Sequence, residues 1–203
     1  MNEIWSSIWR WVYKELLQKL ITPDGGVGVV EDLGSGYSVQ EAQMENAMKL
    51  KALCDEAVSN HNWVAHDITG DGVPETFCNR SVQFIAQGMG YYGFKRDQFA
   101  NDMIQAMGVD AKWREEPFES ARVSQMAQKG VLVVVGLEDH PHGHVVAAAP
   151  EAPQESGSWG EPVPMVAQVG TAKIGNGVKK ISEAFRMADR ARLRVFVLQD
   201  SVA

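Results

Sequence analysis

Cysteine is scarce in this chain, and its scarcity excludes one class of fold. Only two cysteines, Cys54 and Cys78, occur among 203 residues. Two cysteines are too few for a small secreted domain stabilised by disulfides, and they leave room for one reactive thiol. The sequence also lacks any run of about eighteen apolar residues, so we expect no membrane-spanning segment.

Positive charge is scarce as well. The chain has 19 Lys and Arg residues against 26 Asp and Glu residues, which gives a formal net charge of -7. A surface that neutralises a phosphate backbone needs clustered Lys and Arg, so we expect no nucleic-acid partner. Hydrophobic residues make up 45% of the chain and charged residues 22%. This composition and length predict a globular domain with a substantial core and a short appendage.

The N-terminal residues lack the features of a secretory signal. Glu3 stands where a positive charge is usual, and Arg10 and Lys14 interrupt the apolar stretch. We therefore expect synthesis in the cytoplasm without a signal peptide. Apolar residues at helical spacing predict an amphipathic helix over residues 3–21, which packs on the domain or a partner, or alternatively lies on a membrane or cell-wall surface.

The pattern of apolar residues changes along the chain from helical to extended. A glycine-rich linker is expected over residues 22–38. Helices are then predicted at residues 38–59, 78–88, 97–107 and 118–128. Ser38 and Glu41 form a capping box, and Cys54 is interpreted as a buried structural thiol.

Short apolar runs follow the helices. They predict strands at residues 130–136, 143–149, 164–170 and 194–198, with a loop at 151–163 and a helical stretch near 180–190. Helices first and strands after predict an α+β fold in which N-terminal helices pack on a C-terminal antiparallel sheet.

Cys78 and His144 are the strongest candidates for chemistry. Cys78 stands at the predicted start of a helix after a polar stretch, where the helix dipole favours the thiolate. His144 opens a later strand. A cysteine at a helix start and a histidine on a strand form the skeleton of a cysteine hydrolase. Alternatively, Cys78 is a buried apolar residue, and His140, His142 and His144 form a metal-binding loop or a polar turn.

The order of these motifs resembles a known family. Residues 76–79 (Thr-Phe-Cys-Asn) begin a helix, residues 143–147 (Gly-His-Val-Val-Ala) open a strand, and a polar residue lies on the next strand. This order, over about residues 40–200, resembles the papain-like peptidoglycan hydrolases of the NlpC and CHAP types. The resemblance implies a papain-like cysteine hydrolase domain at residues 39–203, after an N-terminal helix and linker at 1–38.

The resemblance also implies a reaction and roles for three residues. The enzyme would cleave amide bonds of peptidoglycan stem peptides through a Cys78 thioester. His144 would be the general base, and Gln168 would orient its ring, with Asn176 as the alternative. The oxyanion would meet the backbone N–H of Cys78. No cofactor is required for this chemistry.

The loop before Cys78 has features of a calcium site. Asp67, Thr69 and Asp71 occupy the first, third and fifth positions of a calcium-loop pattern, and Gly72 occupies the sixth. The twelfth position is Cys78 in place of the usual Glu, which excludes a complete EF-hand. Two interpretations stay open, a partial calcium site and a turn that presents Cys78.

Aromatic residues could line a substrate groove. Trp63, Tyr91 and Trp159 are the candidates for stacking on a sugar or peptide stem, and the alternative is packing in the core.

The resemblance implies a peptidoglycan or peptide substrate, and release to the periplasm or cell wall through a holin or a secretion system. For a secreted effector of this type, an immunity or inhibitor protein is a further partner that stays open. The rival functions are a protease or deamidase acting on proteins, and a binding module without catalysis.

Overall fold

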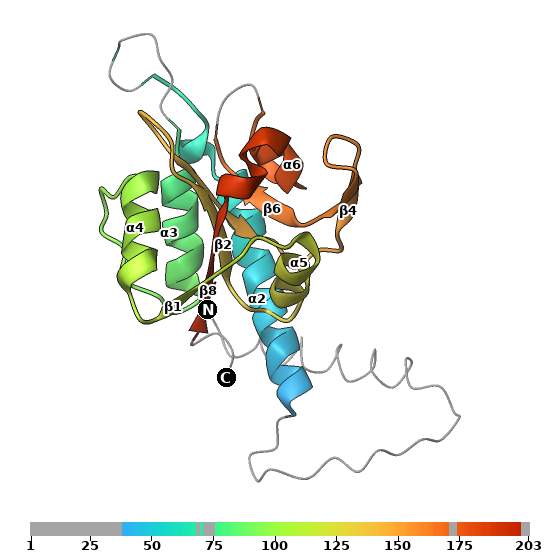
Figure 1. Ribbon diagram of the computed structural model, residues 1–203. Helices are drawn as coiled ribbons and strands as arrows, with labels where there is room; N and C mark the ends of the chain where they lie inside the picture. The colour runs from blue at the N-terminus through green and yellow to red at the C-terminus, as the bar shows by residue number, and fades with distance from the viewer. Residues whose placement is uncertain (1–37, 68–69, 71–75, 171–173, 200–203) are drawn as a thin grey trace, which may run out of the picture. The chain divides into compact units, whose positions relative to one another are not determined.

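The computed structural model describes residues 38–67, 70, 76–170 and 174–199 (Figure 1). The helix expected at residues 3–21 and most of the linker lie outside these described residues. The described elements belong to one compact unit, Tyr37–Ala203.

Helices form the first half of this unit, and several begin where the sequence favours a helix start. The α-helices are α2 Val39–Ser59, α3 Cys78–Gly88, α4 Ala100–Val109, α5 Ser120–Gln128 and the short α6 Ile181–Ala184, with 3-10 turns η1 His61–Trp63 and η2 Met187–Arg192. Both bonds of the expected capping box of α2 are present: Ser38 Oγ accepts from Glu41 N at 3.2 Å, and Glu41 Oε2 accepts from Ser38 N at 2.8 Å.

Strands form most of the second half and make an antiparallel sheet. The six-stranded sheet has the order β1-β8-β2-β3-β6-β7. Its strands are β1 Trp113–Glu116, β2 Val133–Leu137, β3 His144–Ala148, β6 Met165–Gln168, β7 Gly177–Lys180 and β8 Arg194–Leu198. All of its neighbouring strands pair antiparallel. The expected α+β class, with helices before an antiparallel sheet, is confirmed.

Helices cover both faces of this sheet, so the sheet separates two cores (Figure 1). On one face, α2, α3 and α4 contribute Leu50, Val82 and Met103 to a core that also contains Val134 and Val145. On the other face, α5 and α6 pack with the alternate strand residues, among them Val133, Val135 and Val146. Strand β2 is therefore buried along its whole length, which explains its continuous apolar sequence.

The structure corrects two expected boundaries. The expected loop at residues 151–163 contains a hairpin of β4 Gln154–Ser156 and β5 Glu161–Val163. Its strands are too short and too polar for an apolar alternation to reveal them.

Helix α4 begins three residues later than expected, because Asn79 Nδ2 donates to the Gln98 carbonyl at 2.8 Å and Gln83 Nε2 donates to the Lys95 carbonyl at 2.9 Å. These bonds hold the preceding segment as a turn.

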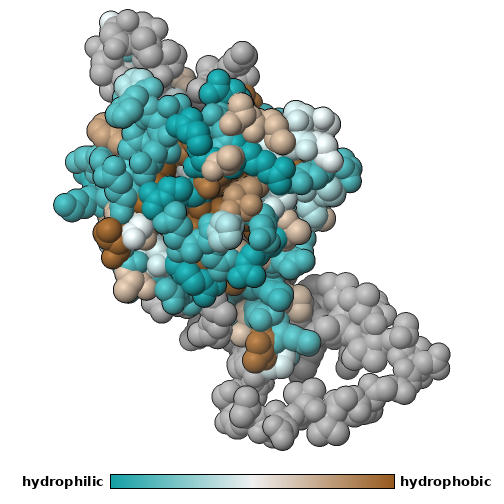
Figure 2. Space-filling model, viewed as in Figure 1, coloured by the Kyte–Doolittle hydropathy of each residue, from teal (hydrophilic) through white to brown (hydrophobic). Residues whose placement is uncertain are grey.

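The surface in the view of Figure 2 is mostly hydrophilic, with apolar residues in small groups between polar ones. Among the described residues, the large apolar side chains that are exposed are Val39, Met48, Val64, Tyr92, Phe99, Val109 and Met187. Among the described helices, none combines the length and the apolar character needed to cross a membrane.

Candidate active site

Cys78 lies at the N-terminus of a buried helix. It is the first residue of α3, follows the N-cap residue Phe77 and is only 4% exposed. The first backbone hydrogen bond of the helix runs from Ser81 N to the Phe77 carbonyl at 3.1 Å. The backbone N–H groups before Ser81 therefore have no carbonyl partner within the helix. They form the positive end of the helix dipole, at which Cys78 lies.

His144 and Gln168 come together because their strands are neighbours. His144 is the first residue of β3, Gln168 is the last residue of β6, and the two strands pair antiparallel. His144 Nε2 lies 3.0 Å from Gln168 Oε1. Because an amide oxygen only accepts, Nε2 must carry the proton that it donates. In the neutral ring the lone pair is then on Nδ1, the nitrogen that remains for Cys78.

The electrostatics of Cys78 and His144 favour a charged pair. Burial is the largest single influence on the pKa of Cys78, and it raises that pKa. The charge and hydrogen bond of His144, together with the N–H groups of Val145 and Asn79, outweigh burial, so the pKa of Cys78 lies below 9.0. Burial likewise lowers the pKa of His144, but the Cys78 thiolate and the Gln168 bond raise it above 6.5. The arrangement therefore stabilises a thiolate beside an imidazolium.

The second cysteine has the opposite environment. Cys54 lies inside α2 with no exposed surface, as expected for a structural thiol. Burial raises its pKa to about 12, and neighbouring Asp55 adds to that effect. Of the two thiols, Cys78 has the lowered pKa and Cys54 the raised one.

Two contacts of the site were not expected from the sequence. Phe185 packs beside the His144 ring, with centroids 5.3 Å apart, and forms an apolar wall. Gly170 lies against the pair: a Cβ there would be 2.5 Å from Gln168 Nε2 and 3.5 Å from His144 Cε1. The sequence signal for Gly170 was a glycine at the end of the predicted strand at residues 164–170, and a glycine in a strand is typical of close backbone approach.

Asn176, the alternative orienting residue, is bonded elsewhere. Its Nδ2 donates to the Trp63 carbonyl at 3.2 Å and its Oδ1 accepts from Gly170 N at 3.3 Å. Of the two candidates, Gln168 is the one hydrogen-bonded to His144. Asn176 instead bonds to the backbone of Gly170, which lies against the Gln168 amide.

The neighbouring histidines have exposed side chains. His140 and His142 lie in the connection between β2 and β3, and Asn101 holds that connection by donating to the Asp139 carbonyl at 2.9 Å. Among the described residues, no three His, Cys, Asp or Glu side chains gather as a metal site would require. The geometry thus sets His144 apart from the other two histidines.

The candidate calcium loop falls largely outside the described residues. Thr69 and Asp71 are among the residues that the structure does not describe. Asp67 Oδ1 accepts from Gly70 N at 2.6 Å, a contact typical of the turn interpretation.

Two of the three candidate substrate-binding aromatics are in the core, which corrects that expectation. Trp159 is 6% exposed and packs edge-on against Phe118 at 5.7 Å. Tyr91 is 3% exposed and donates from its hydroxyl to Asp110 at 2.8 Å. Neither ring has the free face that stacking needs. Trp63 is half-buried against the ring of Phe84, and its carbonyl accepts from Asn176 Nδ2.

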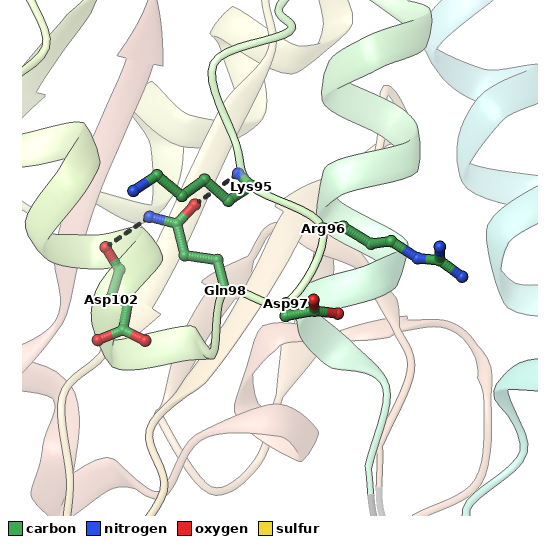
Figure 3. Close-up of a pocket in the computed structure, with 5 residues that line it drawn as sticks. All are labelled: Lys95, Arg96, Asp97, Gln98 and Asp102. Carbon is green, nitrogen blue, oxygen red and sulfur yellow. Dashed lines mark hydrogen bonds between the residues drawn. The ribbon is translucent and has the colours of Figure 1, made fainter.

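A polar pocket of about 360 Å³ lies on the segment between α3 and α4 (Figure 3). Its lining residues are Lys95, Arg96, Asp97, Gln98 and Asp102. Figure 3 shows the Gln98 amide between the backbone N–H of Lys95 and the carbonyl of Asp102, at 3.0 and 3.3 Å. Cys78, His144 and Gln168 do not line this pocket, and its Gln98 amide bonds to the turn before α4 and to the first turn of that helix.

Neither a protein-family model nor a curated protein matches this sequence. The assignment of the site therefore depends on its own chemistry: a buried thiol at a helix start, a histidine of fixed tautomer, and an amide that holds the ring. These are the parts of a nucleophile, a base and an orienting group.

Proposed function

We propose that this protein is a cysteine hydrolase that cleaves amide bonds through a Cys78 thioester. The observation that carries the proposal is the hydrogen bond between His144 Nε2 and Gln168 Oε1, which leaves Nδ1 for the thiol. The lowered pKa of Cys78 and the raised pKa of His144 support it.

The reaction follows from these groups. The Cys78 thiolate attacks the amide carbonyl carbon, and the carbonyl π electrons move to oxygen, where N–H groups of the first turn of α3 stabilise the oxyanion. As the oxyanion re-forms the carbonyl, the C–N bond breaks, and the His144 imidazolium gives its proton to the leaving amine. A water then attacks the thioester carbon while His144 takes its proton, and the C–S bond breaks as Cys78 leaves as the thiolate. The carboxylic acid is released, and the Cys78–His144 pair is restored.

The proposed substrate is the stem peptide of peptidoglycan. This choice is supported by the resemblance of the two motifs around Cys78 and His144 to peptidoglycan hydrolases. Such a substrate would reach the site as an extended peptide across the N-terminus of α3. A protein substrate would use the same chemistry and is distinguished by experiment.

The test is release of muropeptides from purified sacculi by the full chain. We expect wild type to reduce turbidity and release fragments whose masses identify the cleaved bond. Cys78→Ala should abolish release, because the other thiol of the chain, Cys54, is fully buried inside α2. The matched control is Cys54→Ala, the same substitution at the other thiol, which should retain release.

Each other outcome has a clear meaning. No release by wild type, with and without calcium, while Cys78-dependent cleavage or deamidation of proteins is present, would move the substrate to proteins. Undiminished release by Cys78→Ala would eliminate the thioester mechanism. No hydrolysis of either substrate would leave a binding role.

A further inference from the structure

Asn176 connects the two backbone segments that flank the candidate active site. Its side chain bonds to the Trp63 carbonyl at 3.2 Å and to Gly170 N at 3.3 Å. Trp63 belongs to η1, in the connection from α2 toward Cys78, and Gly170 comes two residues after Gln168. One half-buried amide thereby sets the distance between the chain before the nucleophile and the chain after the orienting residue.

Gly170 transmits this restraint to the imidazole. A Cβ at Gly170 would approach Gln168 Nε2 to 2.5 Å, far inside van der Waals contact, so the backbone already lies against this amide. The other end of the same amide accepts from His144. Movement of the Gly170 backbone therefore changes the space in which Gln168 holds the ring.

Both bonds of Asn176 go to backbone groups, which suits a fixed spacer. An amide can donate at one end and accept at the other, so it bridges a carbonyl and an N–H without a net charge. A neutral bridge leaves the Cys78–His144 pair electrostatically undisturbed. The two bonds act from one side chain, so together they restrain the Trp63 and Gly170 backbones relative to each other.

We propose that Asn176 is a positioning residue of this site, which holds Gly170 against the Gln168 amide and so keeps His144 directed at Cys78. The inference rests on the proposed function of Cys78 as the nucleophile. It differs from the orienting role considered from the sequence, because Asn176 acts through two residues and does not itself bond to the ring.

A double-mutant cycle tests this path. The probe is iodoacetamide, and the measured quantity is the rate of Cys78 alkylation at pH 6, followed by mass spectrometry of the Cys78 peptide. We expect Asn176→Ala to slow alkylation about tenfold in the wild-type background. In a Gln168→Ala background the same change should cost less than about twofold, because the group through which it acts is gone.

The matched control is Gln128→Ala. Gln128 also bridges to a backbone carbonyl, that of Glu151 at 3.2 Å, but from α5 on the other face of the sheet. It should leave the alkylation rate unchanged. Asn176→Ser, which keeps a polar group too short to bridge both partners, serves where Asn176→Ala does not fold, as judged by near-ultraviolet circular dichroism.

The outcomes separate this inference from the proposed function. An unchanged rate in Asn176→Ala, or an equal loss in both backgrounds, would overturn the positioning role. If wild-type Cys78 itself reacts only in the pH range of an ordinary thiol, the proposed nucleophile is wrong. If wild-type Cys78 is alkylated at pH 6 and Asn176→Ala is alkylated at the same rate, the positioning role is wrong and the proposed nucleophile stands.

Discussion

At the scale of single residues, the two cysteines show how position decides chemistry. Both are nearly inaccessible, yet burial raises the pKa of Cys54 to about 12, whereas burial at Cys78 is outweighed by His144 and two backbone N–H groups. The difference lies in what surrounds each sulfur: a helix interior in one case and a helix start beside an imidazole in the other. Burial alone therefore does not make a thiol inert.

The pH dependence of alkylation follows from the paired shifts. The pKa of Cys78 is lowered below 9.0 and that of His144 is raised above 6.5, and in each case the charge of the other group is the main cause that opposes burial, so each charged form favours the other. We expect wild-type Cys78 to remain reactive toward iodoacetamide as pH falls well below the range of an ordinary thiol. His144→Ala should move this profile to higher pH, because the favourable charge is lost.

The matched control for that profile is His142→Ala, which removes an exposed histidine two residues away in the same connection. It should leave the profile in place. A wild-type profile that coincides with that of His144→Ala would contradict the ion pair.

At the scale of elements, local sequence determined the helix starts best. The capping box of α2 was readable because Ser38 and Glu41 are three residues apart and bond within one turn. The start of α3 at Cys78 was likewise a local feature. The start of α4 was displaced by side chains of α3, a contact between segments that no local pattern reports.

The stability of α2 should depend on its cap. Ser38→Ala removes the acceptor for Glu41 N, so we expect the free energy of unfolding in urea to fall by about 1 kcal/mol. Ser59→Ala is the matched control at the other end of the helix. The Ser59 hydroxyl donates back to the Asp55 carbonyl, and such a bond contributes little to stability. Its removal should therefore leave the free energy of unfolding nearly unchanged. Equal losses in both variants would contradict the capping contribution.

Strands were predicted where burial makes them apolar and missed where it does not. The strands inside the sheet, such as β2 and β8, carry apolar runs. β1 and β7 are the edges of the sheet, and they contain charged residues, Arg114 to Glu116 and Lys179 to Lys180. Charged residues protect sheet edges against further pairing, and they also remove the apolar alternation that reveals a strand.

The same limit applied to the candidate site. Cys78, His144 and Gln168 could be singled out because each breaks the pattern of its element: a cysteine at a helix start, a histidine at a strand start and an amide in an apolar strand. The directions of the Tyr91 and Trp159 side chains could not be predicted from the sequence, because packing against other segments decides whether a ring faces the core.

At the scale of the whole molecule, ion pairs join the edge of the sheet to the helix beyond it. Glu116, at the end of β1, binds Arg122 of α5 and Arg114 of its own strand. The bond with Arg122 is the main cause that lowers the pKa of Glu116 to about 2, and Arg114 adds to it. The ionised carboxylate thus stabilises the folded state.

This ion pair predicts a component of acid sensitivity. Because the folded-state pKa is lowered, the contribution is fully present above the usual value of 4.5 and is lost as pH falls toward about 2. The free energy of unfolding should therefore differ between wild type and Glu116→Gln at pH 6, and this difference should shrink at pH 3. Glu155→Gln, at an exposed carboxylate of β4, is the control and should match wild type at both values. A difference that stays constant with pH would contradict the linkage.

The placement of the three site residues on α3, β3 and β6 also has a consequence for biosynthesis. The ribosome completes the cysteine helix well before the histidine strand, and the glutamine strand emerges later still. Until β3 packs against α3, the Cys78 sulfur has no imidazole beside it, and until β6 pairs with β3 the ring has no bond to Gln168. A nascent or prematurely terminated chain that lacks β6 therefore carries a thiol without its oriented base, and the hydrolase we propose would become competent to cut only after β6 has joined the sheet.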